Sequence, residues 1–248
     1  MIKKTDGKAK GVFLISIISF IVISIGFLPA VIFGKIILIF ISFNEIWHFF
    51  LLPFLIYIGI FITFFSQLLI SGLFIHIFNY KYKPGVYPYN YNNKMAYKWI
   101  VVCALYTPMR KLLEIFPIGA SKYLYYRMLG MKIGKGTLVG GTIMDPCLTE
   151  IGDNCTIGLY AVIYGHINDY GKKTILMDKI IIGNNVVIGA GAFIMPGVYI
   201  EDDVKIAAGA IVTKSQLLKK GKIYGGIPAK EIKLKKRKFC FMRLITNP

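Results

Sequence analysis

Charged residues are nearly absent from residues 11–78 of this chain. Between Gly11 and Phe78, only Lys35 and Glu45 carry a formal charge. The stretch is long enough for two helices of about 20 residues each, the length that crosses the hydrocarbon layer of a bilayer. A cleaved signal peptide would have a shorter apolar run, and no second run would follow it. The sequence therefore predicts a transmembrane helical hairpin within residues 1–80.

The charges beside the apolar runs predict the orientation of this hairpin. We expect the first span from Val12 to about Phe33 and the second from about Phe49 to Phe78, with an interfacial connection that contains Lys35. Basic residues lie next to both outer ends of the hairpin, and such residues favour the cytoplasmic side. They are Lys3, Lys4, Lys8, Lys10, Lys81 and Lys83. We therefore expect a multi-pass protein of the cell membrane, with the rest of the chain in the cytoplasm.

Cysteine and histidine are also scarce. The four cysteines form no CxxC pair and have no metal-site spacing, which agrees with a reducing compartment. Two of the three histidines lie in the predicted hairpin, which leaves His166 alone downstream. A zinc site that needs three histidines is therefore excluded, and we expect no metal.

Acidic residues are outnumbered by basic ones, 12 to 30, and the formal net charge is +18. Most of the basic residues in excess are lysines, which argues against the bidentate hydrogen bonds to nucleic-acid bases that arginine makes. The lysines cluster beside the predicted spans and in the tail, where anionic lipid headgroups attract them. A phosphate-rich cosubstrate is a second use for these charges. We expect a membrane partner and no nucleic acid.

The second half of the chain has no helical period, and a period of six residues takes its place. An aliphatic residue followed by a small or acidic one recurs from Ile133 to Val212, with one break. The residues two positions before the later anchors are also aliphatic or small, so two of every six side chains alternate inward in short strands. This pattern predicts a parallel β-helix built from hexapeptide repeats. The anchors are Ile133, Val139, Ile151, Ile157, Ile163, Ile182, Ile188, Ile194, Ile200, Ile206 and Val212.

These patterns divide the chain into four regions. The hairpin occupies residues 1–80, an interfacial amphipathic linker 81–127, the β-helix 128–216, and a closing segment with a basic tail 217–248. In the linker we expect short amphipathic helices, broken by Pro108 and Pro117, that lie in the lipid headgroup layer. A helical cap packed on the β-helix is the alternative. The expected interfacial anchors are Trp99, Tyr106, Tyr123, Tyr125 and Tyr126.

The break in the repeat contains the residue best suited to proton transfer. The interval from Ile163 to Ile182 is nineteen residues, one more than three repeats, and it includes His166. A neutral imidazole near pH 7 can take a proton from a reacting group, and a partner on its other nitrogen should fix its tautomer. Asp145, Asp169 and a backbone carbonyl are the candidates for that partner. Asp145 also stands at an anchor position where Ile or Val is expected, so one coil is locally broken there.

These residues resemble the hexapeptide-repeat acyltransferases, in particular membrane-attached members of that family. Three stretches carry the resemblance: the repeats, the break with His166, and the segment from Ile206 to Lys230 with its Ala-Ala-Gly-Ala-Ile-Val-Thr-Lys and Gly-Gly-Ile-Pro-Ala-Lys strings. It covers about residues 128 to 235. The resemblance implies a mainly β protein with a left-handed coil, assembled as a homotrimer with active sites in the grooves between β-helices. It also implies transfer of an acyl group, often acetyl, from coenzyme A to a hydroxyl or amine.

The resemblance implies roles for several residues. His166 matches the position of the family's catalytic base, with Asp145 or Asp169 to orient it. Backbone N–H groups are expected to bind the oxyanion, and Gly165 or Gly189 could allow its close approach. Acetyl-CoA or another acyl-CoA would lie along the later coils, where small residues admit its pantetheine arm and lysines meet its phosphates. The expected cofactor-binding residues are Gly189, Ala190, Ala208, Lys214 and Lys230.

The predicted membrane location indicates the chemical class of the acyl acceptor but not its identity. A catalytic domain tethered to a membrane suggests a glycan or lipid-linked precursor reached at the cytoplasmic face, and a small-molecule acceptor stays open. A non-enzymatic alternative is also open, in which the β-helix oligomerises or binds a ligand and the hairpin anchors it.

Overall fold

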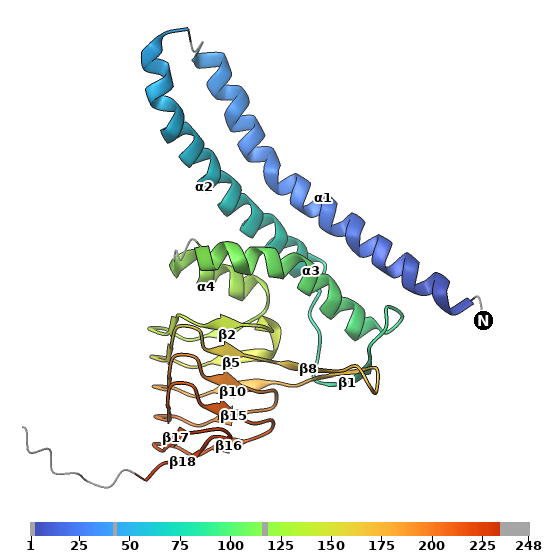
Figure 1. Ribbon diagram of the computed structural model, residues 1–248, viewed down its shortest axis with the longest axis vertical. Coiled ribbons are helices and arrows are strands. Elements are labelled where there is room, and N and C mark those ends of the chain that lie inside the picture. The colour runs from blue at the N-terminus through green and yellow to red at the C-terminus, as the bar shows by residue number, and fades with distance from the viewer. Residues whose placement is uncertain (1–2, 42–43, 116–118, 234–248) are drawn as a thin grey trace, which may run out of the picture.

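The computed structural model describes residues 3–41, 44–115 and 119–233 of the 248-residue chain. Two long helices are followed by two shorter helices and then by a stack of short strands (Figure 1). The basic tail beyond residue 233, with Cys240 in it, and Pro117 lie outside the described residues. The helices are α1 (Lys3–Phe40), α2 (Ile46–Ile77), α3 (Lys94–Ile115) and α4 (Gly119–Met128).

α1 and α2 form a hairpin that leans away from the strands (Figure 1). The segments Lys10–Phe40 and Ile46–Ile77 have mean hydropathies of 2.7 and 2.3, and both are long and apolar enough to cross a membrane. In the most apolar part of each segment, only 17% and 6% of the residues are buried within the protein. A core helix of a soluble protein is mostly buried. The structure therefore contains two helices that could span a bilayer.

The connection between the two helices is shorter than predicted. α1 continues through Lys35 to Phe40, and α2 begins at Ile46 rather than near Phe49. The residues that follow Phe33 contain no proline and are apolar apart from Lys35, so nothing in them ends the helix. Lys35 therefore lies within α1 and not in an interfacial connection.

α3 and α4 form a layer between the hairpin and the strands (Figure 1). α3 runs through Pro108 as one helix of 22 residues, although proline removes one intrahelical hydrogen bond. The Tyr106 hydroxyl donates to the Ile143 carbonyl in the strand stack. On the other side of the layer, the hydroxyls of Tyr125 and Ser71 of α2 are hydrogen-bonded at 3.2 Å. The layer is thus fixed to both neighbours.

The aromatic side chains of this layer point into the protein. Most of the predicted interfacial anchors are buried, because the layer is covered by the hairpin on one side and by the β-helix on the other. The alternative, a helical cap packed on the β-helix, describes this arrangement, and the prediction of lipid anchoring is wrong for Trp99, Tyr106, Tyr125 and Tyr126.

The short strands form three sheets, which are the faces of a parallel β-helix of stacked coils. This arrangement confirms the architecture predicted from the repeats. The handedness of the coil stays a prediction. The five-stranded sheet contains β2 (Lys132–Ile133), β5 (Thr149–Ile151), β10 (Ile180–Ile182), β13 (Tyr199–Ile200) and β16 (Leu217–Leu218). The six-stranded sheet contains β3 (Leu138–Val139), β6 (Thr156–Ile157), β11 (Val187–Ile188), β14 (Lys205–Ile206), β17 (Ile223–Gly225) and the antiparallel β18 (Lys230–Glu231). The four-stranded sheet contains β4 (Thr142–Ile143), β7 (Val162–Ile163), β12 (Phe193–Ile194) and β15 (Ile211–Val212).

The predicted anchors fill the interior of the stack. All of them except Val139 are buried, and Ile188 pairs directly with Ile206 of the next coil. Burying such a side chain contributes about 1.5–3 kcal/mol relative to leaving it exposed. Leu218 and Tyr224 are also buried and continue the interior column. The β-helix therefore extends beyond residue 216, where we predicted its end.

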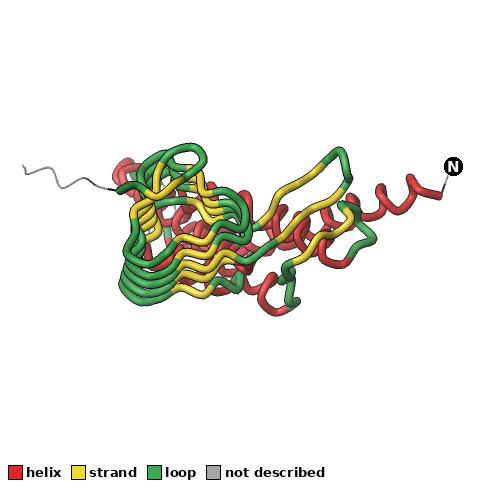
Figure 2. Tube along the Cα trace, turned by 90° about the horizontal axis from the view of Figure 1, so that it is seen from below, coloured by secondary structure: helices red, strands yellow, loops and turns green. Residues whose placement is uncertain are grey.

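The break in the repeat is a β-hairpin rather than an irregular loop. Strands β8 (His166–Asp169) and β9 (Thr174–Met177) pair antiparallel, and β1 (Gly85–Pro88) from the linker pairs with the other edge of β9. Viewed along the coil axis, these three strands project from the stack of coils (Figure 2). His166 is the first residue of β8, at the point where the chain leaves the stack.

Candidate active site

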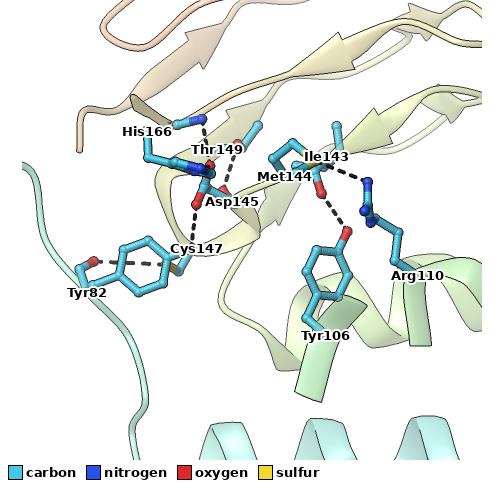
Figure 3. Close-up of polar contacts among 10 residues, drawn as sticks. Tyr82, Tyr106, Arg110, Ile143, Met144, Asp145, Cys147, Thr149 and His166 are labelled. Carbon is cyan, nitrogen blue, oxygen red and sulfur yellow. Dashed lines mark hydrogen bonds and ion pairs between the residues drawn. The ribbon is translucent and has the colours of Figure 1, made fainter. Parts of the chain in front are cut away.

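The register of the four-stranded sheet brings Asp145 and His166 together. Ile143 of β4 pairs with Ile163 of β7, so the residues that follow these two strands also lie beside one another. His166 Nδ1 lies 2.6 Å from Asp145 Oδ2 (Figure 3). The carboxylate is completely buried and the imidazole side chain is 10% exposed. The pair is thus held in a nearly closed site, where electrostatic interactions are stronger than in water.

Asp145 does not stand at an interior anchor position as predicted. The interior residue is Ile143, four positions after Val139 instead of six, because the corner formed by residues 140–141 is short. A 3-10 turn, η1 (Pro146–Leu148), follows Asp145 and restores the register before β5. Asp145 therefore lies at the corner after β4, beside the base of the projecting hairpin.

Three donors hold the Asp145 carboxylate. Oδ2 accepts from His166 Nδ1 and, at 2.8 Å, from the backbone N–H of Gly165, while Oδ1 accepts from the Tyr82 hydroxyl at 2.7 Å. Burial, and then the charge of Asp145, raise the pKa of Tyr82 well above its usual value, so this phenol stays protonated and donates. An ionised carboxylate only accepts, so the imidazole hydrogen lies on Nδ1 and leaves Nε2 as an acceptor.

Gly165 permits this close approach. A Cβ at Gly165 would lie 2.7 Å from the Cβ of Asp145 and 3.1 Å from the Cβ of Leu148. Its N–H is donated to Asp145, and the N–H of Gly189 is donated to the Ile206 carbonyl at 2.8 Å. Both N–H groups are therefore already used within the protein, and which backbone N–H groups would bind an oxyanion stays a prediction.

Aromatic rings pack around the imidazole. The ring centroid of Trp99 from α3 lies 4.8 Å from that of His166, with an interplanar angle of 64°, and that of Tyr164 lies 6.3 Å away at 75°. Tyr164 in turn stacks on Phe193. Within the described part of the chain, Trp99 Nε1 is buried without a hydrogen-bond partner, and His166 Nε2 also has none. The rings fix the imidazole while Nε2 keeps its lone pair.

Asp169 is not brought to the imidazole. It lies at the far end of β8, roughly 10 Å along the extended strand from His166. Its Oδ1 accepts the backbone N–H of Lys172 at 2.9 Å, which stabilises the turn of the hairpin. Of the three candidates for the partner of Nδ1, the structure selects Asp145.

The five predicted cofactor-binding residues are spread over the later coils. Gly189 and Ala190 follow β11, and Ala208 lies at the same corner of the next coil, where a Cβ on Gly189 would be only 2.7 Å from the carbonyl carbon of Ala207. Gly189 must lack a side chain because the successive corners stack closely there. Two exposed lysines lie elsewhere, Lys214 in the turn after β15 and Lys230 in β18. Among the described residues, no three His, Cys, Asp or Glu side chains are grouped to hold a metal ion.

The sequence patterns did not indicate two of the residues that contact the pair. Tyr82 and Trp99 precede His166 by more than 60 residues. Tyr82, in the segment before β1, contacts Asp145, and Trp99 of α3 contacts His166. No local signal connects them to the break in the repeat. Tyr164 does lie in that break, directly after the anchor Ile163, and its position could have marked it.

Several solved structures are similar to part of this chain. One is a maltose O-acetyltransferase from Clostridium difficile 630, with 20% identity over 60% of this chain and 92% of that chain and a TM-score of 0.46. A hexapeptide-repeat-containing acetyltransferase from Vibrio cholerae O1 biovar eltor, complexed with acetyl coenzyme A, has 22% identity over 46% of this chain and 76% of that chain, with a TM-score of 0.40. A galactoside acetyltransferase in complex with coenzyme A has 24% identity over 51% of this chain and 80% of that chain, with a TM-score of 0.36.

The sequence of the β-helix matches two family models. Residues 179–214 match the bacterial transferase hexapeptide model, and residues 149–165 match the model for the hexapeptide repeat of succinyl-transferase. No curated protein sequence matches the chain. Both matched segments fall within the stacked coils that carry His166 and its neighbours. These matches identify the stacked coils as hexapeptide repeats.

Proposed function

We propose that this protein is a membrane-anchored acyltransferase that moves an acyl group, acetyl in the first instance, from coenzyme A to a hydroxyl or amine. The observation that carries the proposal is the buried pair formed by His166 and Asp145, joined at 2.6 Å. A carboxylate with three donors and an imidazole with a free Nε2 is the arrangement that a general base requires. The fold alone would not support an activity, because one fold serves many functions.

The residues of this chain would act on the acceptor's proton. The hydroxyl or amine of the acceptor donates to His166 Nε2 and loses its proton as its oxygen or nitrogen bonds to the acyl carbon. The C–S bond then breaks, and the imidazolium returns the proton to the departing thiolate. Asp145 stabilises the imidazolium through Nδ1, and its other contacts keep it fixed during the step.

Coenzyme A supplies the acyl group as a reactive thioester when it is bound. Ala190 and Ala208 are exposed at stacked corners beside the four-stranded sheet, and they offer a surface without large side chains for an extended arm. Lys214 and Lys230 are exposed and, within the described residues, form no ion pair. These features support the assignment of Gly189, Ala190, Ala208, Lys214 and Lys230 to the cosubstrate.

The membrane anchor is the second part of the proposal. Large apolar side chains cover the hairpin, among them Phe13 at 68%, Phe20 at 74% and Phe50 at 74% exposed. An apolar surface of this extent is unstable in water and is accommodated by a bilayer. We place the hairpin across the cell membrane with the β-helix in the cytoplasm, assembled as a homotrimer, and the acceptor as a glycan, a lipid-linked precursor or a small molecule.

Thioester turnover by the purified full-length protein tests the activity. The protein in detergent is mixed with acetyl-CoA and candidate acceptors, and release of the coenzyme A thiol is followed with a disulfide dye. Removal of a general base lowers turnover by about 10²- to 10⁴-fold, so His166→Ala should lose most of the activity. His166→Gln, which keeps a polar side chain of similar reach, should be equally impaired.

His76→Gln is the matched control. His76 lies in α2 and contacts the Met128 carbonyl, away from the pair, so this variant should keep wild-type turnover. Full activity of His166→Ala on a genuine acceptor would show that His166 is not the base. Absence of thiol release by the wild type with every class of acceptor would favour the non-enzymatic alternative.

A further inference from the structure

A polar pocket lies beside the proposed catalytic pair. It has a volume of about 630 Å³ and is bounded by the second half of α3, by α4 and by the outer face of the four-stranded sheet. Its polar lining comes from Arg110, Lys111, Glu114, Lys122, Thr142, Tyr160 and Tyr164. Three of these side chains are cationic and one is anionic, so the pocket has an excess of positive charge.

The single carboxylate neutralises one of the three cations. Glu114 Oε2 lies 2.7 Å from Lys111 Nζ, and Glu114 Oε1 accepts from the Thr142 hydroxyl at 3.3 Å. Both carboxylate oxygens are thus engaged. The charges of Arg110 and Lys122 are left without an ion pair within the described residues.

Among the described residues, Arg110 hydrogen-bonds only to a weak acceptor. Its Nη1 lies 3.1 Å from the Met144 sulfur, and a thioether is a poor acceptor (Figure 3). A half-buried guanidinium has lost part of its hydration, and such a loss is costly unless an anion or strong acceptors replace the water. Arg110 is therefore prepared to bind an anion that enters the pocket.

Lys122 is the second uncompensated cation. Its Nζ donates to the carbonyls of Val139 at 2.8 Å and Gly141 at 3.0 Å, which fixes the ammonium and leaves one of its three N–H donors unused. Burial lowers the pKa of Lys122, and nearby Glu114 opposes this shift. An anion in the pocket would favour the charged form.

Two charges at one pocket match a dianion better than a monocarboxylate. A phosphate monoester carries about −1.5 to −2 charges at pH 7, and its oxygens are the acceptors that guanidinium and ammonium groups bind best. Tyr164, which also lines the pocket, carries a hydroxyl that can donate as well. The chemistry of the lining therefore selects a phosphate or diphosphate group.

The pocket shares its wall with the catalytic pair. Met144 lines the pocket and directly precedes Asp145, and the ring of Tyr164, which also lines it, lies against the ring of His166. The helical layer that bounds the pocket is also the layer on which the membrane hairpin rests (Figure 1). If that hairpin spans a bilayer, the pocket lies near the headgroup region.

We propose that this pocket binds the phosphate or diphosphate of the acyl acceptor, so that the acceptor is a phosphate-bearing molecule. The inference rests on the proposed function, because it specifies the acceptor of the same site. Two sources share this chemistry: a lipid-linked phosphate presented by the membrane, and a soluble phosphorylated or nucleotide-linked acceptor.

Binding to the full chain in a neutral detergent tests the proposal without turnover. The probes are inorganic pyrophosphate, dodecyl phosphate, dodecyl alcohol and acetate, titrated calorimetrically with coenzyme A present to occupy any phosphate site of the cosubstrate. Pyrophosphate should bind the wild type, and acetate and dodecyl alcohol should not. Arg110→Gln should weaken pyrophosphate binding by about tenfold or more, since it removes charge-assisted hydrogen bonds.

Lys205→Gln is the control for net charge, because Lys205 is exposed on β14, outside the pocket. It should change the affinity by less than about twofold. Arg110→Lys keeps the positive charge but lacks the planar guanidinium that can donate two parallel hydrogen bonds. This variant should retain part of the binding. A melting curve of each variant checks that it is folded.

The probes also separate the two sources. Dodecyl phosphate binding at least about tenfold tighter than pyrophosphate assigns the pocket to a lipid-linked acceptor, and equal affinities assign it to a soluble one. Failure of the wild type to bind either phosphate, or unchanged binding by folded Arg110→Gln, overturns the proposal. Phosphate binding without acyl turnover would overturn the proposed function but not the pocket. Turnover of an uncharged acceptor without phosphate binding would overturn the pocket proposal but not the proposed function.

Discussion

At the residue scale, the site depends on a carboxylate that cannot be left unsatisfied. Asp145 is completely buried, and a charge in that position is tolerated only if donors replace the lost water. Gly165 and His166 provide two of those donors from adjacent positions, and Tyr82 provides the third from the segment before β1. The same contacts that stabilise Asp145 fix the tautomer of the imidazole.

Asp145→Asn should therefore impair catalysis more than substrate binding. An amide NH₂ facing Nδ1 would favour the tautomer with the hydrogen on Nε2, which cannot accept a proton. We expect kcat to fall by about 10²- to 10⁴-fold with little change in the KM for acyl-CoA. Asp169→Asn is the matched control, since Asp169 lies on the same hairpin and does not contact His166, and it should keep kcat within about twofold. Equal losses in both variants would contradict the assigned role.

The thiols of Cys103, Cys147 and Cys155 should be unreactive at neutral pH. Burial is the main reason that the pKa of Cys147 is raised to about 12, and burial also raises the pKa values of Cys103 and Cys155. Only the thiolate reacts with alkylating reagents, so the rate should stay low at pH 8 and rise only as the pH approaches 12. In a Cys240→Ser background, alkylation by N-ethylmaleimide at pH 8 should be more than about tenfold slower for the folded protein than for the denatured chain. Equal rates would show that the thiols are not shielded.

At the element scale, the period of six predicted the coils because it reports directly on which side chains are inside. The anchors from Ile151 to Val212 are buried in register, as the pattern requires. The position of Asp145 could not be predicted in the same way, because the corner after Val139 is two residues short and shifts the register. A repeat pattern carries no information on such a local change until the strands are paired.

The elements that complete the site come from outside the repeat. Strand β1 pairs with β9, and α3 brings Trp99 to His166, yet neither segment contains a pattern that predicts its partner. Contacts between distant segments depend on tertiary packing, which propensity and periodicity do not encode. The candidate base was therefore predictable from the sequence, whereas most of its surroundings were not.

The interior column should dominate the stability of the coils. Ile188 is buried in β11, and its neighbour Val187 is 39% exposed on the same strand. Ile188→Ala removes buried methyl groups and leaves a cavity, which costs about 2–5 kcal/mol and should lower Tm by roughly 5–15 °C. Val187→Ala should cost less than about 1 kcal/mol. Thermal unfolding in detergent measures both, and similar losses would contradict the inward register.

At the scale of the whole molecule, three layers follow one another along one direction. The apolar hairpin comes first, the helical cap follows, and the β-helix extends beyond it (Figure 1). The cap formed by α3 and α4 is packed on both sides. Tyr125 is hydrogen-bonded to Ser71 in the hairpin, and Tyr106 is hydrogen-bonded to the Ile143 carbonyl in the coils. A hairpin in the bilayer would therefore hold the site at a fixed distance from the membrane surface, which is the geometry that a membrane-bound acceptor needs.

The orientation of this arrangement can be tested with two introduced cysteines. Asn44 lies in the short connection between α1 and α2, and Lys205 lies on the outer surface of β14; both are exposed. Lysines flank the outer ends of the hairpin, so we expect the connection to face the outside and the β-helix to face the cytoplasm.

In the Cys240→Ser background, a membrane-impermeant maleimide added to intact cells should label Asn44→Cys, and Lys205→Cys should be labelled only after permeabilisation. The background chain should stay unlabelled in both conditions, because the raised pKa values of its remaining thiols keep them protonated. Labelling of Lys205→Cys in intact cells would place the β-helix outside. Protection of both sites until permeabilisation would mean that the hairpin does not cross the membrane.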